Sequence, residues 1–221
     1  FEYTLSTPYD ISTAVFVHNF SLNEDSSSRP FGVRFNNDGS KMFIAGRSEQ
    51  RVFEYSLSRK FDISSATYTG NFISVDDQVS NTLFGLAFSP DGKMMFVSES
   101  EDGLHQYSLN KSFDLSGGVN FIRSADVPTY LDGDTQNGIA FNQSGTRMFL
   151  IDSQKNAVNQ YTLSEGFNIA TASLDGGAVS TIDPNGITFS PSGLRMYVSG
   201  KDSAIKEHHL PCPFNLFSGK C

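Results

Sequence analysis

The stretch FGLAFSPDGKMMFV, residues Phe84–Val97, reads as two short strands joined by a tight turn. Its turn holds Pro90, whose φ is fixed by the ring, and Gly92, which tolerates a positive φ, and this combination is typical of a hairpin. Three further copies are FGVRFNNDGSKMFI (31–44), NGIAFNQSGTRMFL (137–150) and NGITFSPSGLRMYV (185–198). The recurrence predicts one structural unit used four times.

A second repeated segment follows each hairpin, with polar and apolar residues in alternation and then a polar turn. Its copies are FEYSLSRKFDIS (53–64), HQYSLNKSFDLS (105–116) and NQYTLSEGFNIA (159–170), with FEYTLSTPYDIS (1–12) at the start and a degraded KEHHLPCPFNLF (206–217) near the end. Each full period therefore reads as four strands, such as 85–88, 93–98, 104–109 and 120–124, without a helical period.

A period of about 50 residues with four strands is typical of a β-propeller blade. The sequence predicts an all-β fold, a single propeller domain over residues 1–221 whose four blades have hairpins starting near residues 31, 84, 137 and 185. We expect N- and C-terminal strands to close the ring, with Val15–Ser21 completing the last blade. Phe1–Leu5 and Lys206–Leu210 then compete for one strand position or share a five-stranded blade. Two packed sheets, five blades and a ring built from several chains are the alternatives.

The hairpins GLAFSPDGKMMFVSES and GITFSPSGLRMYVSG resemble the repeats of the YVTN, NHL and lactonase-type β-propeller proteins. The resemblance covers all four hairpins, and so nearly the whole chain. It implies an architecture and leaves the activity open. The Tyr-x-Leu-x-x-x-Phe-Asp-Ile-Ser segment departs from those families and implies a longer turn between the third and fourth strands.

Composition excludes several classes of function. The formal net charge of −8 argues against a nucleic-acid partner, because Lys and Arg must replace the counterions of phosphate. No run of 18 apolar residues exists, so we expect no membrane span. The chain opens at Phe1 inside what reads as a strand, and we expect an upstream segment to have been removed. A secreted, extracellular or periplasmic protein is the expectation.

Both cysteines, Cys212 and Cys221, lie in the last ten residues. Neither stands in a cluster of His and Cys residues of the kind that binds zinc. A disulfide that pins the tail 211–221 is the favoured interpretation, and two free thiols are the alternative.

The positions where the copies differ are the candidates for function, because packing explains what they share. Arg34 occupies a position where the other copies have a small residue, namely Ala87, Ala140 and Thr188. A charged side chain on an inner strand needs a partner. We expect either a bound anion in the channel or a salt bridge to a carboxylate.

A second candidate set could converge at the channel mouth. It consists of Asn137, Asn185, Glu99 and Asp152, which could hold a metal, although Phe31 and Phe84 replace the two Asn residues in the other copies. The longest loop, Ala125–Gln136, adds Tyr130 as a contact residue and Asp132 with Asp134 as a calcium site.

No Gly-x-Ser-x-Gly motif or phosphate loop is present, so a binding or scaffold module is the expected function. It would contact a protein or glycan through one loop face and need no cofactor, with calcium as the alternative. The family resemblance implies a second possibility, a metal-dependent lactonase-like hydrolase. A third is a structural subunit that pairs through an open strand edge, and the chain would then be an oligomer rather than a monomer.

Overall fold

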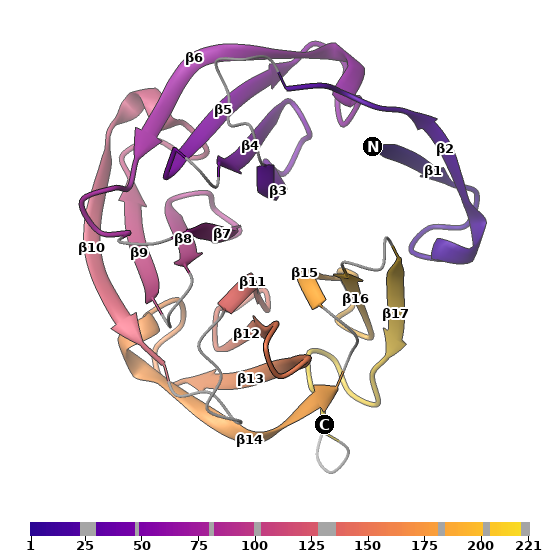
Figure 1. The fold of residues 1–221 in the computed structure, drawn as a ribbon, viewed down its shortest axis with the longest axis vertical. Coiled ribbons are helices and arrows are strands. Elements are labelled where there is room, and N and C mark those ends of the chain that lie inside the picture. Colours follow the sequence, from indigo (N-terminus) through magenta and orange to yellow (C-terminus); the bar gives the residue numbers. More distant parts are fainter. Residues whose placement is uncertain are drawn as a thin grey trace.

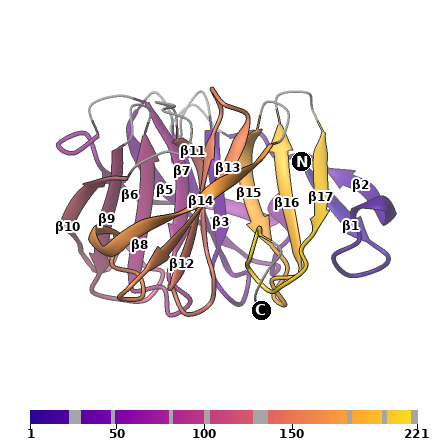
Figure 2. The ribbon, with the colours of Figure 1, turned by 90° about the horizontal axis from the view of Figure 1, so that it is seen from below.

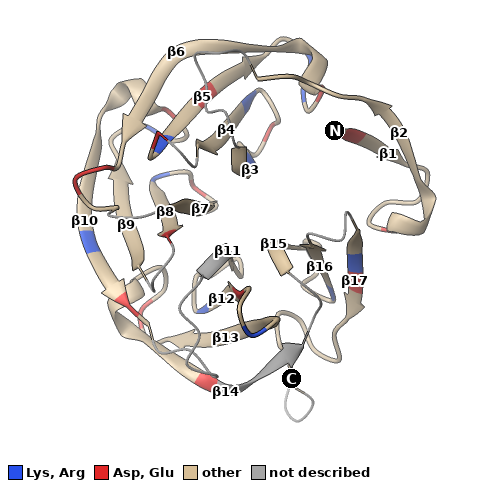
Figure 3. Cartoon of the chain, in the orientation of Figure 1, with Lys and Arg blue, Asp and Glu red and all other residues tan. Residues whose placement is uncertain are grey.

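The computed structural model arranges four antiparallel sheets as blades around a central axis (Figures 1 and 2). It describes residues 1–22, 30–46, 49–79, 82–99, 103–127, 136–180, 184–200 and 204–217, with the backbone alone at 136–137 and 176–180. The all-β propeller with four blades is confirmed. Charged residues are dispersed around the ring rather than gathered on one side (Figure 3).

Each blade runs from the axis outwards in chain order. Blade 1 contains β3 (Pro30–Phe35), β4 (Lys41–Gly46), β5 (Arg51–Leu57) and β6 (Ala66–Ser74). Blade 2 contains β7 (Leu83–Phe88), β8 (Met94–Glu99), β9 (Gly103–Leu109) and β10 (Val119–Asp126). Blade 3 contains β11 (Gln136–Phe141), β12 (Arg147–Asp152), β13 (Ala157–Leu163) and β14 (Ala172–Ser180). Blade 4 contains β15 (Pro184–Phe189), β16 (Arg195–Gly200) and β17 (Ile205–His209).

The remaining strands, β1 (Glu2–Leu5) and β2 (Ala14–His18), form a two-stranded sheet of their own, the N-terminal hairpin. It lies at the outer rim between blades 4 and 1 (Figure 1). The expectation that Val15–Ser21 would complete the last blade is therefore wrong, because β2 pairs with β1. Nor do β1 and β17 share a sheet, since β17 is the third strand of blade 4. The N-terminal hairpin corresponds to the third and fourth strands of a blade, which form its outer half.

The inner strands β3, β7, β11 and β15 follow one another around the axis, close enough to require small residues. A Cβ atom added to Gly138 on β11 would lie 2.9 Å from the carbonyl oxygen of Asn185. This distance is shorter than van der Waals contact, so the glycine at this position is needed for the approach of two backbones.

Aromatic side chains fill the space between successive blades. Phe43 of blade 1 packs against Phe88 and Phe113 of blade 2, with ring centroids 4.8 and 6.3 Å apart. Equivalent groups join the next blades and comprise Phe96 with Phe141 and Phe167, and Phe149 with Phe189 and Phe214. Each group combines a second-strand aromatic of one blade with two Phe residues of the next, so burial of these rings holds neighbouring blades together.

A ring of hydrogen bonds reinforces this packing. A Glu or Gln on the third strand of one unit accepts a hydrogen bond from a backbone N–H in the turn of the next unit, and we call this contact the inter-blade latch. The latches join Glu2 to Ile63 (2.9 Å), Glu54 to Leu115 (2.8 Å), Gln160 to Leu216 (2.8 Å) and Glu207 to Ile11 (3.5 Å). Between blades 2 and 3, Arg123 donates to the side chain of Asn168 instead. The latches place the N-terminal hairpin in a fifth position of the ring.

The turn that contains each latch donor is built from one pattern. An aromatic residue with positive φ comes first, as at Phe113 (φ 50°), and Asp or Asn follows. This Asp or Asn caps a short 3-10 helix in every such turn except that of Phe214 and Asn215. The four helices are η1 (Ile11–Thr13), η2 (Ile63–Ser65), η3 (Leu115–Gly117) and η4 (Ile169–Thr171). The ammonium of Lys111 and the hydroxyl of Ser116 hold the pKa of Asp114 well below its usual range. The hydroxyl of Ser64 and the Arg59 guanidinium lower the pKa of Asp62 to about 2.

We expect these carboxylates to make the fold sensitive to acid. A carboxylate whose folded pKa lies below its unfolded value of 3.8 contributes stability that is complete above that value and is lost as the pH falls below it. Unfolding monitored from pH 7 to pH 2 should therefore show a loss of stability below about pH 4. Asp114→Asn should cost about 1–2 kcal/mol at pH 7 and less at pH 2, because part of the stabilisation by this carboxylate is lost once the pH is below the unfolded pKa. A cost that is the same at both pH values would contradict this.

Candidate functional site in the axial channel

Arg34, on the inner strand β3, reaches across the axis of the ring. Its Nη2 atom donates to the carbonyl oxygens of Ile139 on β11 (2.8 Å) and Ile187 on β15 (3.3 Å). Its Nη1 atom donates to the carbonyl oxygen of Val33 at 2.8 Å. No carboxylate of the described residues forms an ion pair with the guanidinium. The expected salt bridge is thus absent from the described part of the chain, and backbone carbonyls take its place.

Arg34 keeps its charge in this position. Burial lowers the pKa of Arg34 to about 10, which still leaves the guanidinium protonated at neutral pH. A guanidinium carries five N–H donors, and the three carbonyl contacts use three of them. The channel therefore contains a positive charge with donors left for a further acceptor.

Two cavities meet at this side chain. The turn-side cavity, of about 350 Å³, has a polar rim of Asn37, Asn142 and Gln143 and lies among the hairpin turns of the four blades. The loop-side cavity, of about 390 Å³, begins at the other end of the inner strands and includes Asn185. Arg34 lines both, so it forms the floor that separates the two mouths of the channel.

Of the other sequence candidates, Asn185 lies near Arg34, and the rest lie apart from it or outside the described residues. Asn185 shares the loop-side cavity with Arg34, whereas Glu99 and Asp152 line neither channel cavity. Tyr130, Asp132, Asp134 and the side chain of Asn137 lie outside the described residues, so the contact and calcium sites stay predictions. The same holds for the disulfide, because Cys221 is not described, while Cys212 is buried.

Glu99 belongs to a different polar group, at the loop end of blade 2. Its Oε1 atom lies 3.0 Å from Nε2 of His105, and Nδ1 of His105 lies 2.8 Å from the hydroxyl of Ser124. Glu99 and His105 are both buried. The three side chains come from β8, β9 and β10, so they cross the blade on one face and satisfy each other.

Blade 3 carries shorter residues at the same two positions, Asp152 and Asn159, each 1% exposed. Asp152 accepts a hydrogen bond from the backbone N–H of Lys155 through Oδ1, but its Oδ2 and both polar atoms of the Asn159 side chain have no hydrogen-bond partner among the described residues. Buried polar atoms without partners are costly, and a trapped water commonly supplies them. In the sequence, the signal for this buried polar position was that the third copy has Asn159 where the first copy has Phe53.

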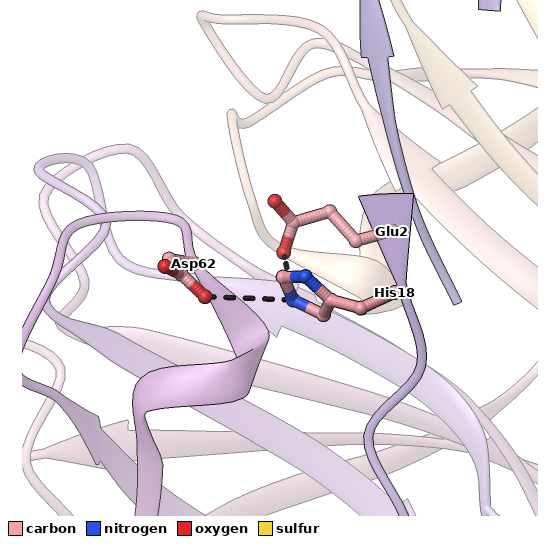
Figure 4. Close-up of side chains that lie close together, drawn as sticks. All are labelled: Glu2, His18 and Asp62. Carbon is pink, nitrogen blue, oxygen red and sulfur yellow. Dashed lines mark ion pairs between the residues drawn. The ribbon is translucent and has the colours of Figure 1, made fainter. Parts of the chain in front are cut away.

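One group of described residues could hold a metal ion. Glu2, His18 and Asp62 offer ligand atoms that all lie within 4.8 Å of one another (Figure 4). Nε2 of His18 lies 3.2 Å from Glu2 and 3.4 Å from Asp62.

The interface between blades 1 and 2 has two corresponding carboxylates, with a basic side chain between them instead of a metal. Glu54 and Asp114 are joined by Lys41, whose Nζ atom lies 3.1 and 3.5 Å from them. The imidazole of His18 lies between Glu2 and Asp62 in the same way. The group is thus the latch that joins the N-terminal hairpin to blade 1, and the sequence shows His18 only as an isolated residue.

Comparison with solved structures shows that the chain shares a β-propeller fold with known proteins. No protein-family model and no curated protein matches the sequence. A protein from Bacteroides uniformis, provisionally named a 6-phosphogluconolactonase, matches with a TM-score of 0.59 and 15% identity. The match covers 94% of this chain and 59% of that protein's chain. The periplasmic gluconolactonase of Pseudomonas aeruginosa has a TM-score of 0.55 and 15% identity, covering 81% and 49%. The likeness at this identity establishes the shared fold.

The same fold occurs in proteins of other kinds. Kuenenia stuttgartiensis hydrazine synthase matches with a TM-score of 0.54 and 18% identity, covering 88% of this chain and 49% of that chain. The chain thus spans about half to three fifths of the length of these structures. Among the described residues, no helix is long and apolar enough to cross a membrane.

Proposed function

We propose that this chain binds a small organic anion in its axial channel, with Arg34 as the group that recognises the negative charge. The observation that carries the proposal is a guanidinium that crosses the channel, has no carboxylate partner among the described residues and forms the floor of two cavities. Guanidinium groups form strong, directional hydrogen bonds with carboxylate and phosphate oxygens.

The turn-side cavity is the favoured place for this ligand. Its volume of about 350 Å³ falls within the range of small-molecule sites. Ser89 and Ser190 add hydroxyl groups to its lining, and Phe88 and Phe189 add apolar faces. A charged floor, polar rim and aromatic walls together suit a ligand with one acidic group and several hydroxyl groups. A sugar acid is the class that fits best.

The structural neighbours support a second candidate, hydrolysis of a sugar lactone. Two of them are named for gluconolactone or its 6-phosphate, and opening such a lactone yields a sugar acid. Arg34 would then bind the carboxylate of the product or the phosphate of the substrate. A lactonase would be an enzyme, whereas the first candidate needs binding alone.

Calorimetric titration tests both candidates. We expect 6-phosphogluconate and gluconate to bind more tightly than glucose, and Arg34→Gln to weaken the two anions by about 10- to 100-fold, since a hydrogen bond to a charged group contributes about 1.5–3 kcal/mol. Arg34→Lys retains the charge and should retain part of the affinity. Equal affinity of the wild type and Arg34→Gln for the anions would contradict the proposal. Acid release from gluconolactone above its spontaneous rate would favour the lactonase.

The loop-face interpretation, a scaffold that contacts a protein or glycan, receives less support, because most of the residues that would form that face lie outside the described ones. A periplasmic or secreted location is part of the proposal. It is supported by the periplasmic gluconolactonase among the structural neighbours.

A further inference from the structure

The fifth position of the ring holds only the outer half of a blade. In blades 1 to 4 the third strand, β5, β9, β13 or β17, pairs on its inner side with a second strand. Its counterpart β1 pairs with β2 alone, and no described strand pairs with its inner edge. The backbone N–H and C=O groups on that edge are thus available to another strand.

Cavities lie on both sides of the place where the inner strands would be. A third cavity, of about 460 Å³, separates β1 from blade 1, and apolar residues such as Tyr3, Val33 and Phe61 line it. The loop-side cavity separates blade 4 from the hairpin, where Leu5, Tyr9 and Tyr197 line it. The two walls that face the fifth position are thus largely apolar and already formed.

The aromatic group on the wall formed by blade 1 lacks one member. Phe35 and Phe61 pack together at 5.6 Å, but among the described residues no second-strand aromatic from a preceding unit joins them. Phe61 is consequently 51% exposed, whereas its counterpart Phe113, which contacts Phe43, is 9% exposed. The missing member would be a second-strand aromatic like Phe43.

The turn of the N-terminal hairpin lacks its partner in the same way. Phe113 packs over Gly92 in the hairpin turn of its own blade, and its N–H donates to the Gly92 carbonyl at 2.9 Å. Tyr9 has a similar positive φ, 63°, but is 48% exposed, and its carbonyl oxygen accepts hydrogen bonds from Arg195 and Tyr197 of blade 4. The place that a turn glycine fills in each blade stays open beside its ring.

We propose that the fifth position is a docking site for one β-hairpin of the type that the repeat uses for its own inner strands. Such a hairpin has Gly-x-x-Phe in its first strand, Gly in its turn and Met followed by an aromatic in its second strand. Its second strand pairs with β1, its aromatic completes the group of Phe35 and Phe61, and its turn glycine lies under Tyr9. The unpaired edge of β1, the incomplete aromatic group of Phe35 and Phe61, and the exposed ring of Tyr9 therefore select one occupant.

Charge supports the same choice. The residue before Met on the second strand is basic in three of the four blades. In blades 1 and 4 it pairs with the latch carboxylate of its own blade, Lys41 with Glu54 (3.1 Å) and Arg195 with Glu207 (2.9 Å). In the fifth position that carboxylate is Glu2, which faces the docking site. The turn-side cavity beneath Arg34 lies among the turns of blades 1 to 4, so docking leaves it open.

A peptide with the sequence of Asn185–Gly200, NGITFSPSGLRMYVSG, is the probe, because it carries the basic residue before Met. We expect it to bind the 221-residue chain with 1:1 stoichiometry, to raise the melting temperature and to slow hydrogen exchange of the Glu2–Leu5 amides. A control peptide with Ser in place of Phe189, Met196 and Tyr197 should bind at least about 10-fold more weakly, since each lost aromatic or Met contact removes more than about 1 kcal/mol. Phe61→Ser in the protein should weaken the unmodified peptide to a similar degree.

An isolated hairpin is marginally stable in water, so the same sequence is also fused ahead of Phe1 through a Gly-Ser linker of about ten residues. The fused chain should melt at a higher temperature, protect the Glu2–Leu5 amides and no longer bind the free peptide. An unchanged melting temperature together with unprotected amides would overturn the proposal. So would protection of those amides that appears only with concentration-dependent dimerisation of the original chain, because a second copy would then be the occupant.

Discussion

Gly92→Ala is expected to destabilise the chain by about 3 kcal/mol or more. Gly92 has φ +68°, a conformation that costs an L-residue about 1–2 kcal/mol. A Cβ atom built there would lie 2.1 Å from the ring of Phe113, so the ring must leave its position between Phe43 and Phe88. Displacing a packed core side chain adds about 1–3 kcal/mol. Denaturant unfolding of the two chains measures the sum.

Gly70→Ala is the matched control, because Gly70 has φ +82° and no heavy atom lies within 4 Å of the Cβ position. It should cost only the backbone contribution, about 1–2 kcal/mol. The difference between the two variants isolates the contact between the turn glycine and the aromatic of the next turn. Equal losses of stability would show that this contact does not hold the hairpin turns in place.

Glu54→Ala is expected to cost about 3 kcal/mol. The carboxylate is 2% exposed, accepts a hydrogen bond from the Leu115 N–H at 2.8 Å and lies 3.1 Å from the ammonium of Lys41. Alanine would leave the buried N–H without an acceptor and Lys41 with Asp114 alone. Loss of one partner of a buried pair is strongly destabilising for this reason.

Glu54→Gln separates the latch from the ion pair. Gln160 occupies the same position in blade 3 and accepts from the Leu216 N–H at 2.8 Å, so glutamine can form the latch. We expect Glu54→Gln to cost about 1 kcal/mol, because it loses only the attraction to Lys41. If Gln and Ala are equally destabilising in thermal and denaturant unfolding, the latch hydrogen bond is not what joins the blades.

The strands of the blades could be predicted from sequence because their signals are local. The turn at Pro90–Gly92 and the alternation on either side fix β7 and β8 to within one or two residues of their observed ends. Four copies of one pattern also fixed the architecture, since stacking identical units buries a continuous core.

The closure of the ring needed information that no single copy contains. Residues 1–12 match the third-strand segment of the blades, and β2 follows them as a fourth strand does, yet the sequence allowed Val15–Ser21 to be assigned to the last blade. The Glu or Gln before Tyr in this segment marks the position of the inter-blade latch. This role cannot be read from the sequence, because the latch joins distant residues such as Glu207 and Ile11, which are 196 residues apart.

The candidate site was predictable in part for a related reason. The charge of Arg34 on a strand of small residues showed that it needs a partner. Its acceptors are backbone carbonyls of Ile139 and Ile187, and every residue has a carbonyl, so the sequence could not point to them. His18 and Asn159 were missed because their surroundings come from other strands of the fold.

The most direct test of an anion site at Arg34 is a crystal structure of the chain soaked with 6-phosphogluconate. We expect density for the ligand in the turn-side cavity, with a carboxylate or phosphate oxygen within hydrogen-bond distance of the Arg34 guanidinium. The same soak of Arg34→Gln should leave the cavity without ligand. A wild-type channel free of ligand at saturating concentration, with Arg34 still donating only to the carbonyl oxygens, would contradict the account.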